Sequence, residues 1–134
     1  MSDPTPVTRA VTYERDGHRY LSCGSRLNLQ YQHRAAVCMG GRKIQPLLVE
    51  GVTSCANCNP QDEDVLQAEA LRCGWKIRKC VSDAARVPVF YPLDKTWFML
   101  TGEGMRIRIT TAEAMSMMHD VYGTEYDDKK GLVP

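Results

Sequence analysis

The chain has almost no excess charge and no long hydrophobic run, and both absences exclude classes of protein. Seventeen basic and sixteen acidic residues leave a net charge of +1, so no overall field draws the protein to nucleic acid or to an anionic membrane. No apolar run approaches the roughly 18 residues that cross a bilayer, and the N-terminal stretch lacks the apolar core of a signal peptide. We therefore expect a cytoplasmic protein without membrane contact, whose contacts with nucleic acid are local.

The length and the cysteine content narrow the class further. A chain of 134 residues with 43% hydrophobic content can bury one core but not two full domains. Six cysteines without a secretion signal favour reduced thiols or metal ligands over a disulfide framework. A Cys-x-x-Cys pair and one upstream cysteine form the candidate cluster Cys23, Cys55 and Cys58, whereas we expect Cys38, Cys73 and Cys80 to be ordinary buried thiols.

The first half of the chain predicts a flexible arm, two strands and a helix. Two prolines among small polar residues suggest that residues 1–10 are an extended or disordered arm. Apolar and polar residues alternate over residues 27–32, which predicts a half-buried strand closed by His33. Residues 47–54 predict a second strand that pairs with the first as a hairpin. Asn59 as N-cap and Pro60 at the first helical position then predict a helix over residues 60–72, stopped by Gly74.

The second half predicts a small β region and a final helix. We expect a short strand over residues 75–79, a hairpin of residues 87–91 and 95–100, and a third strand over 105–109. Thr110 and Glu113 match the capping-box pattern and predict a helix over residues 110–123, followed by a loose tail over 124–134. The methionines of this helix suit docking on the core, a homodimer or a partner; they are Met115, Met117 and Met118.

A series of short motifs, each present once, lies along residues 14–104. They are Glu14-Arg15-Asp16-Gly17, Cys23-Gly24-Ser25, Leu29, His33-Arg34, Met39-Gly40-Gly41, Cys55 with Cys58, Glu63, Gly74-Trp75, Val87-Pro88-Val89 and Trp97-Phe98-Met99-Leu100. In these motifs the chain resembles the HNH endonucleases, in particular the small zinc-knuckle type encoded by phages and prophages of actinobacteria. The resemblance implies an α+β fold, with an HNH-like ββα-metal core over residues 11–75, a C-terminal β-hairpin appendage over 76–109 and the final helix.

The resemblance also implies a catalytic site. His33 would be the general base that activates a water against the scissile phosphate, with Glu50 in the position that orients it. A magnesium or other divalent ion would be held by Gln32 and Asn59, where the family usually has a charged or more basic ligand at the first position. Asn59 is equally suited to serve only as the helix cap.

The zinc knuckle is altered at one position. Tyr20 stands where the family has its first cysteine, so a structural zinc would rest on Cys23, Cys55 and Cys58, with His18 or water as the fourth ligand. The alternative is a knuckle packed by apolar side chains and thiols, with the Tyr20 ring in the vacated position.

The substitutions fall on ligand positions, which favours a catalytically impaired pseudo-nuclease that binds nucleic acid or a host protein, in the host cytoplasm if the protein is phage-encoded. The alternative is an active metal-dependent HNH DNA endonuclease. A basic patch beside His33 would contact phosphates or be an ordinary solvated loop; its residues are Arg34, Arg42 and Lys43.

Overall fold

The chain begins with a helix where the sequence predicts a flexible arm. The computed structural model describes residues 4–34, 46–55, 67–78 and 81–127. Helix α1 (Pro6–Arg15) starts at Thr5, whose side chain accepts a hydrogen bond from the backbone N–H of Thr8 at 3.1 Å. The proline at the first helical position has no N–H to leave unpaired, and its fixed φ suits a helix. The predicted arm is therefore wrong for residues 6–10.

The predicted hairpin is confirmed, with a shorter second strand. Strand β1 (Leu29–His33) pairs antiparallel with β2 (Gly51–Cys55), in a register that sets Leu29 opposite Cys55 and His33 opposite Gly51. Residues 48–50, which we expected in the second strand, form the 3-10 helix η1 (Leu48–Glu50) instead. Residues 35–45, between the two strands, lie outside the described part of the chain.

Helix α2 (Gln67–Arg72) is the described end of the helix predicted over residues 60–72. It stops at Gly74, which has a φ of +75°. A Cβ at this position would lie 1.8 Å from the carbonyl oxygen of Pro88, so only glycine allows the chain to pass so close to the second sheet. The beginning of the predicted helix, up to residue 66, lies outside the described residues.

The second sheet has three antiparallel strands in the order β3-β4-β5: β3 (Val89–Tyr91), β4 (Thr96–Leu100) and β5 (Arg106–Ile109). They confirm the predicted hairpin and third strand. The strand predicted over residues 75–79 is reduced to a single bridge, in which the N–H of Ile77 donates to the carbonyl of Arg34 at 2.7 Å. The short 3-10 helix η3 (Ala84–Arg86) precedes β3.

Two helices close the described chain. Helix α3 (Thr111–Tyr122) carries the predicted capping box, because Thr110 and Glu113 exchange side-chain to backbone bonds of 3.0 Å in both directions. Helix α4 (Thr124–Asp127) follows, and the hydroxyl of buried Tyr126 donates to the carbonyl of Arg72 at 2.9 Å. The predicted loose tail is therefore wrong for residues 124–127.

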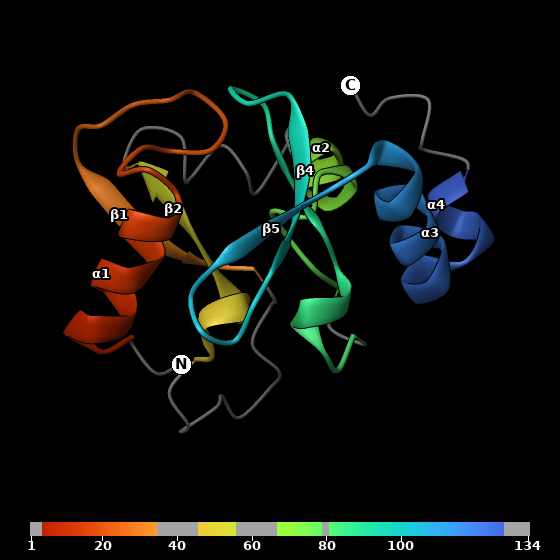
Figure 1. Ribbon diagram of the computed structural model, residues 1–134, viewed down its shortest axis with the longest axis horizontal. Helices are drawn as coiled ribbons and strands as arrows, with labels where there is room; N and C mark the ends of the chain where they lie inside the picture. Colours follow the sequence, from red (N-terminus) through yellow and green to blue (C-terminus); the bar gives the residue numbers. More distant parts are fainter. Residues whose placement is uncertain (1–3, 35–45, 56–66, 79–80, 128–134) are drawn as a thin grey trace.

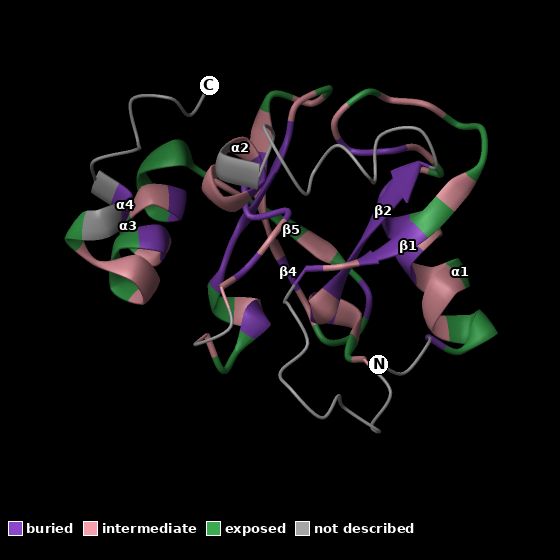
Figure 2. Cartoon of the chain, turned by 180° about the vertical axis from the view of Figure 1, so that it is seen from behind, coloured by how far each residue is buried: buried purple, intermediate pink, exposed green. Residues whose placement is uncertain are grey.

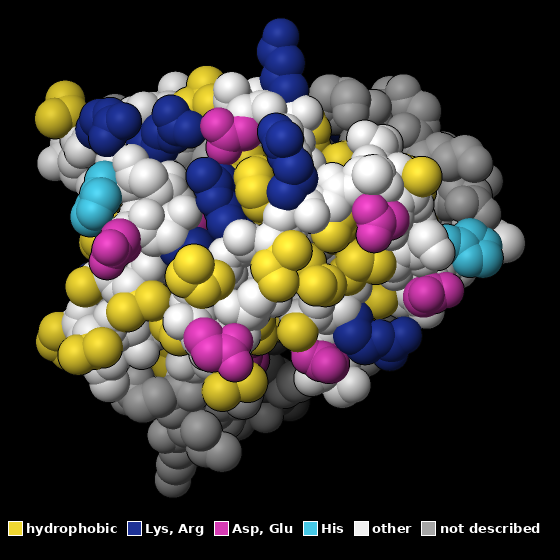
Figure 3. Space-filling model, viewed as in Figure 1, with side chains coloured by type: hydrophobic (Ala, Val, Ile, Leu, Met, Phe, Trp, Pro, Cys, Tyr) yellow, Lys and Arg dark blue, Asp and Glu magenta, His cyan; other side chains and the backbone are white. Residues whose placement is uncertain are grey.

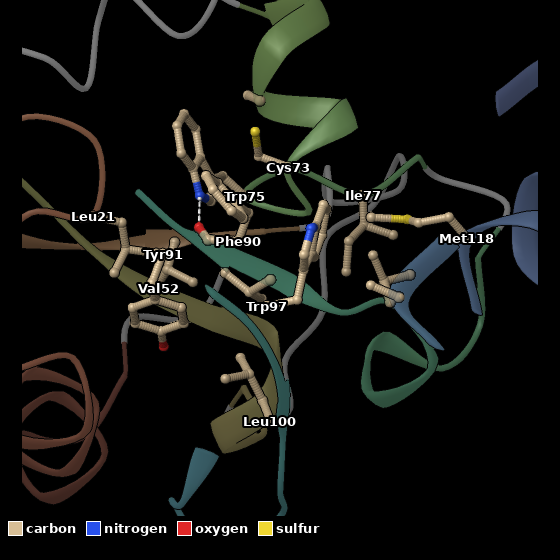
Figure 4. Packing of buried hydrophobic residues seen from close by; sticks show 14 of the residues in the cluster. Leu21, Val52, Cys73, Trp75, Ile77, Phe90, Tyr91, Trp97, Leu100 and Met118 are labelled. Carbon is tan, nitrogen blue, oxygen red and sulfur yellow. Dashed lines mark hydrogen bonds between the residues drawn. The ribbon is translucent and has the colours of Figure 1, made fainter. Parts of the chain in front are cut away.

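One hydrophobic core runs through both sheets. In Figure 1, α1 and the β1-β2 hairpin lie on one side of the three-stranded sheet and α3 and α4 lie on the other. Figure 2 shows the most buried segments meeting where β2 passes the second sheet. The core contains Trp75 and Trp97, which confirms them as packing residues, together with Val52 from the hairpin and Met118 from α3 (Figure 4). The β region predicted as an appendage thus shares its core with the hairpin.

The structure confirms the mixed α and β class. None of the helices among the described residues is long and apolar enough to cross a membrane. Ala114 and Met118 of α3 are completely buried, so this helix docks on the core. Docking was one of the three roles expected for its methionines, beside a homodimer and a partner. Met118 is thereby excluded from the dimer surface that the same pattern suggested.

Candidate functional site

His33 lies at the end of β1, beside Tyr31 and opposite Gly51 of β2. Its ring meets the ring of Tyr31 edge to face, with centroids 5.1 Å apart, and its cross-strand partner is Gly51. The Tyr31 ring lies across Gly51, where a Cβ would come within 2.1 Å of Tyr31 Cζ. Any larger residue at position 51 would displace Tyr31 and with it the ring against which His33 rests.

The hydroxyl of Tyr31 is buried and has no hydrogen-bond partner among the described residues. Burial, with a further contribution from the nearby charge of Glu50, raises the pKa of Tyr31 to about 12. The phenol is therefore neutral at physiological pH. It serves as a packing surface for His33 and offers no charge to a metal or to a phosphate.

Glu50 is next to Gly51, and hence next to the cross-strand partner of His33. One of its carboxylate oxygens accepts the backbone N–H of Leu47 at 2.6 Å, which closes the η1 turn. The backbone carbonyl of Glu50 accepts the N–H of Arg34 at 2.8 Å and so extends the hairpin ladder. The role expected for Glu50 in orienting His33 stays a prediction.

Gln32 and His33 point to opposite faces of the hairpin, since successive side chains of a strand alternate. Gln32 is opposite Val52, on the face that packs into the core, and only 6% of its surface is exposed. Neither its amide oxygen nor its amide nitrogen has a hydrogen-bond partner among the described residues. The sequence pattern placed Gln32 on the polar face of a half-buried strand; it is buried because both faces of this hairpin are covered.

Arg34 was expected to contact phosphate, and this expectation is wrong. The residue is 1% exposed and its guanidinium donates to four backbone carbonyls, those of Val49, Gly74, Ala84 and Val87, at 2.7 to 3.2 Å. Burial, followed by repulsion from Arg15, lowers its pKa to about 10, so it is still charged at neutral pH. Its charge is used inside the protein, where it joins the hairpin to the segments before β3.

A second buried network centres on Asp16, in the Glu-Arg-Asp-Gly motif that sequence reasoning left without a role. Asp16 is 1% exposed and pairs with Arg15 through two contacts, at 2.8 and 3.0 Å. Its carboxylate also accepts the N–H of Thr53 at 2.9 Å and the hydroxyl of Tyr91 at 2.6 Å. The Arg15 guanidinium donates further to the carbonyls of Leu48 and Gly51.

This network connects α1 to both sheets and holds Gly51, the cross-strand partner of His33, in place. Burial opposes the charge of Arg15, but the attraction of Asp16 outweighs it, so the pKa of Arg15 lies above its usual value. A buried pair of this kind keeps its charge because the two side chains bond each other and the surrounding carbonyls, N–H groups and hydroxyl. The adjacent Arg-Asp pair ahead of a Gly was the available signal, but adjacency in sequence does not reveal burial.

The knuckle has the geometry of half a zinc site. The Sγ atoms of Cys23 and Cys55 are 3.8 Å apart, and the N–H of Ser25 points to Cys23 Sγ at 3.4 Å. Two thiolates that share a tetrahedral zinc, each about 2.3 Å from the ion, are separated by about 3.8 Å. The spacing of Cys23 and Cys55 therefore fits two of the four ligand positions of a zinc site.

The other residues expected in or near the knuckle do not complete a zinc site among the described residues. Among the described residues no third His, Cys, Asp or Glu completes a metal-binding group with this cysteine pair, so His18 is not brought to it. Tyr20 is buried and its backbone carbonyl accepts the N–H of Gly24, which forms the knuckle turn. Cys73 lies elsewhere in the core, where burial raises its pKa to about 12, as expected of an ordinary buried thiol. The remaining predicted site residues lie outside the described part of the chain; they are Arg42, Lys43, Cys58 and Asn59.

No protein-family model, curated protein or solved structure matches the chain. The functional conclusion therefore depends on the residues and geometry given above.

Proposed function

We propose that the chain is an HNH-like protein of the zinc-knuckle type that binds nucleic acid or a host protein without cleaving DNA. The observation that carries the proposal is the burial of Gln32. A catalytic divalent ion requires ligands that present oxygen or nitrogen atoms to the same solvent-accessible space as the base. Gln32 is a neutral amide, 6% exposed, and its side chain is on the opposite face of the hairpin from His33.

The order of the elements supports the HNH-like part of the proposal. The knuckle turn, the hairpin and the helix that follows occur in the order expected of a ββα-metal core, and His33 is at the end of its strand opposite Gly51. The buried arginines hold this arrangement through backbone carbonyls. A scaffold stabilised in this way tolerates the loss of catalytic ligands, because its folding does not depend on them.

Cleavage of a supercoiled plasmid tests the proposal. Purified protein is incubated with magnesium, manganese or nickel ions, beside a His33→Ala variant and a His119→Ala variant, which removes an exposed histidine on α3. We expect no nicking above background by any of the three proteins. Nicking by the wild type and by His119→Ala, but not by His33→Ala, would establish the alternative function of an active endonuclease with His33 as general base.

The spacing of Cys23 and Cys55 favours retention of a structural zinc, with Cys58 as the third ligand. When bound, the ion would tie the knuckle to the end of β2. Metal analysis of the purified protein is expected to give stoichiometric zinc that is lost in Cys55→Ser and kept in Cys73→Ser. Protein that is folded, reduced and free of zinc would instead support a knuckle packed by thiols and apolar side chains.

A further inference from the structure

Basic side chains gather on the face of the molecule where the knuckle loop meets the second sheet. Figure 3 shows several Lys and Arg side chains there, with one acidic side chain among them. The knuckle loop contributes two cations, and the turn after β3 and strand β5 contribute three. We call this set the basic surface; it consists of Arg19, Arg26, Lys95, Arg106 and Arg108, with Asp94 at its centre.

Asp94 holds two of the arginines at once. Its carboxylate is 3.4 Å from the guanidinium of Arg19 and 3.1 Å from that of Arg106, and all three side chains are about a third exposed, at 29%, 32% and 27%. One carboxylate neutralises one of the two cations, so this group keeps a net positive charge. Because the pairs are solvent-exposed, they are weak and can rearrange around a stronger anion.

Arg106 is oriented by two aromatic rings as well as by Asp94. Its guanidinium lies 4.5 Å from the centre of the Tyr91 ring and 4.4 Å from that of Phe98. Stacking on rings leaves the in-plane N–H groups of an arginine free to donate, and their fork matches two phosphate oxygens. Arg108, on the same strand, is exposed and donates to the hydroxyl of Thr96 at 3.4 Å.

The knuckle loop is packed against the turn that carries Asp94 and Lys95. Leu93 contacts Gly24 so closely that a Cβ on Gly24 would lie 2.8 Å from Leu93 Cδ1. Arg26 is exposed and donates to the carbonyl of Gly17 at 3.1 Å, on the same loop as Arg19. The cations of the loop and those of the sheet therefore belong to one continuous surface.

The concentration of charge is unusual for a nearly neutral chain. The basic surface holds five of the 17 basic residues and one of the 16 acidic residues, which leaves twelve basic and fifteen acidic residues for the rest of the chain. A local excess of four positive charges is thus set against a negative remainder. Such polarity orients a polyanion toward this face and away from the others.

We propose that the basic surface binds the phosphate backbone of a polynucleotide without reading its sequence. Four of the five cations are arginines, one of them preorganised by stacked rings, which suits the paired oxygens of successive phosphates. An acidic protein is the less favoured partner, because the phosphates of a polynucleotide present a denser and more regular row of negative charges than an acidic protein surface does. The proposal deepens the binding role given above and rests on it, while placing the contact away from Arg34.

Fluorescence anisotropy with a labelled duplex and a labelled single strand, each of about 20 nucleotides, tests this surface. The test variant Arg26→Gln/Lys95→Gln/Arg108→Gln removes three exposed cations, and Arg86→Gln removes an exposed cation on η3 as a matched control. We expect binding at low salt with a log-log salt slope of about −3 to −4 for the duplex, as for about four neutralised phosphates. The triple variant should bind at least tenfold more weakly, with a slope shallower by up to about three.

The results that would contradict the binding surface differ from the result that would contradict the absence of cleavage. Equal binding by the wild type and the triple variant, or an equal loss with Arg86→Gln, would contradict the assignment of this surface. Binding to poly-glutamate but to neither polynucleotide would contradict the proposal and indicate that the partner of the basic surface is an acidic protein. A comparison of duplex and single strand identifies which polynucleotide is bound. Plasmid nicking would refute the absence of cleavage while leaving this binding result unchanged.

Discussion

Two buried arginines, Arg15 and Arg34, hold the hairpin by donating hydrogen bonds to backbone carbonyls. Arg34 follows a histidine, in a position where a cation suggests a phosphate contact, yet it is buried and donates to four carbonyls. Arg15 is paired with Asp16 and reaches the carbonyls of Leu48 and Gly51. Which carbonyls remain unpaired after the strands form depends on tertiary structure, so residue type alone cannot identify the donor that will satisfy them.

The buried pair of Arg15 and Asp16 predicts a large effect of a small substitution. Asp16→Asn keeps the shape of the side chain and leaves the Arg15 charge buried and unpaired, which should lower the free energy of unfolding by about 3 to 5 kcal/mol. The matched control is Asp94→Asn, which breaks two pairs whose side chains are about a third exposed and should cost less than about 1 kcal/mol. Urea unfolding followed by circular dichroism measures both. Similar losses in the two variants would contradict the central role of Asp16.

Local signals predict the elements well where the sequence carries its own capping chemistry. The capping box of Thr110 and Glu113 and the stop at Gly74 both appear where expected. The start of helix α1 was missed although Thr5 and Pro6 are a cap and a first-turn proline, because the two prolines were interpreted as features of an extended arm. Residues 48–50 were assigned to a strand on hydrophobicity alone, whereas Glu50 closes a 3-10 turn that a strand pattern does not reveal.

Helix α3 should gain stability from Glu113 only above acidic pH. Hydrogen bonds from Thr110 hold the pKa of Glu113 below the ordinary value of 4.5. A carboxylate with a lowered pKa in the folded state stabilises the fold above its unfolded pKa, and the contribution is lost as the pH falls through the folded pKa. The midpoint temperature of thermal unfolding should therefore be higher for the wild type than for Glu113→Gln at neutral pH. The difference between the two should disappear as the pH is lowered. Glu103→Gln, on the turn between β4 and β5, controls for general loss of a carboxylate; an equal gap for that variant would refute the role of the cap.

At the scale of the whole molecule, the sequence predicts a core and a separate β appendage, whereas the structure packs both around one hydrophobic cluster. The predicted core over residues 11–75 and appendage over 76–109 share the side chains of Val52, Trp75, Trp97 and Leu100 in one cluster. Contacts between distant segments decide such a boundary, and periodicity within each segment carries no information about them. The same limit hid the basic surface, whose members come from segments more than sixty residues apart, such as Arg19 and Asp94.

A shared core predicts a single cooperative unfolding transition. Tryptophan fluorescence reports on Trp75 and Trp97, both less than 5% exposed, and far-ultraviolet circular dichroism reports on the helices of both ends. In urea the two signals should change together with the same midpoint, as in a two-state domain. Two separated transitions would show that the β region unfolds independently of the hairpin.

The proposed absence of DNA cleavage requires that no catalytic ion is held beside His33. The most direct measurement is the effect of manganese ions on the nuclear magnetic resonance signals of the His33 ring, since a bound paramagnetic ion removes the signals of nearby nuclei. His18 and His119, both exposed, are the other two histidines of the chain and serve as internal references. We expect the His33 signals to broaden no more than those of His119 as manganese is added. Selective loss of the His33 signals at substoichiometric manganese would contradict the proposal and indicate an intact catalytic metal site.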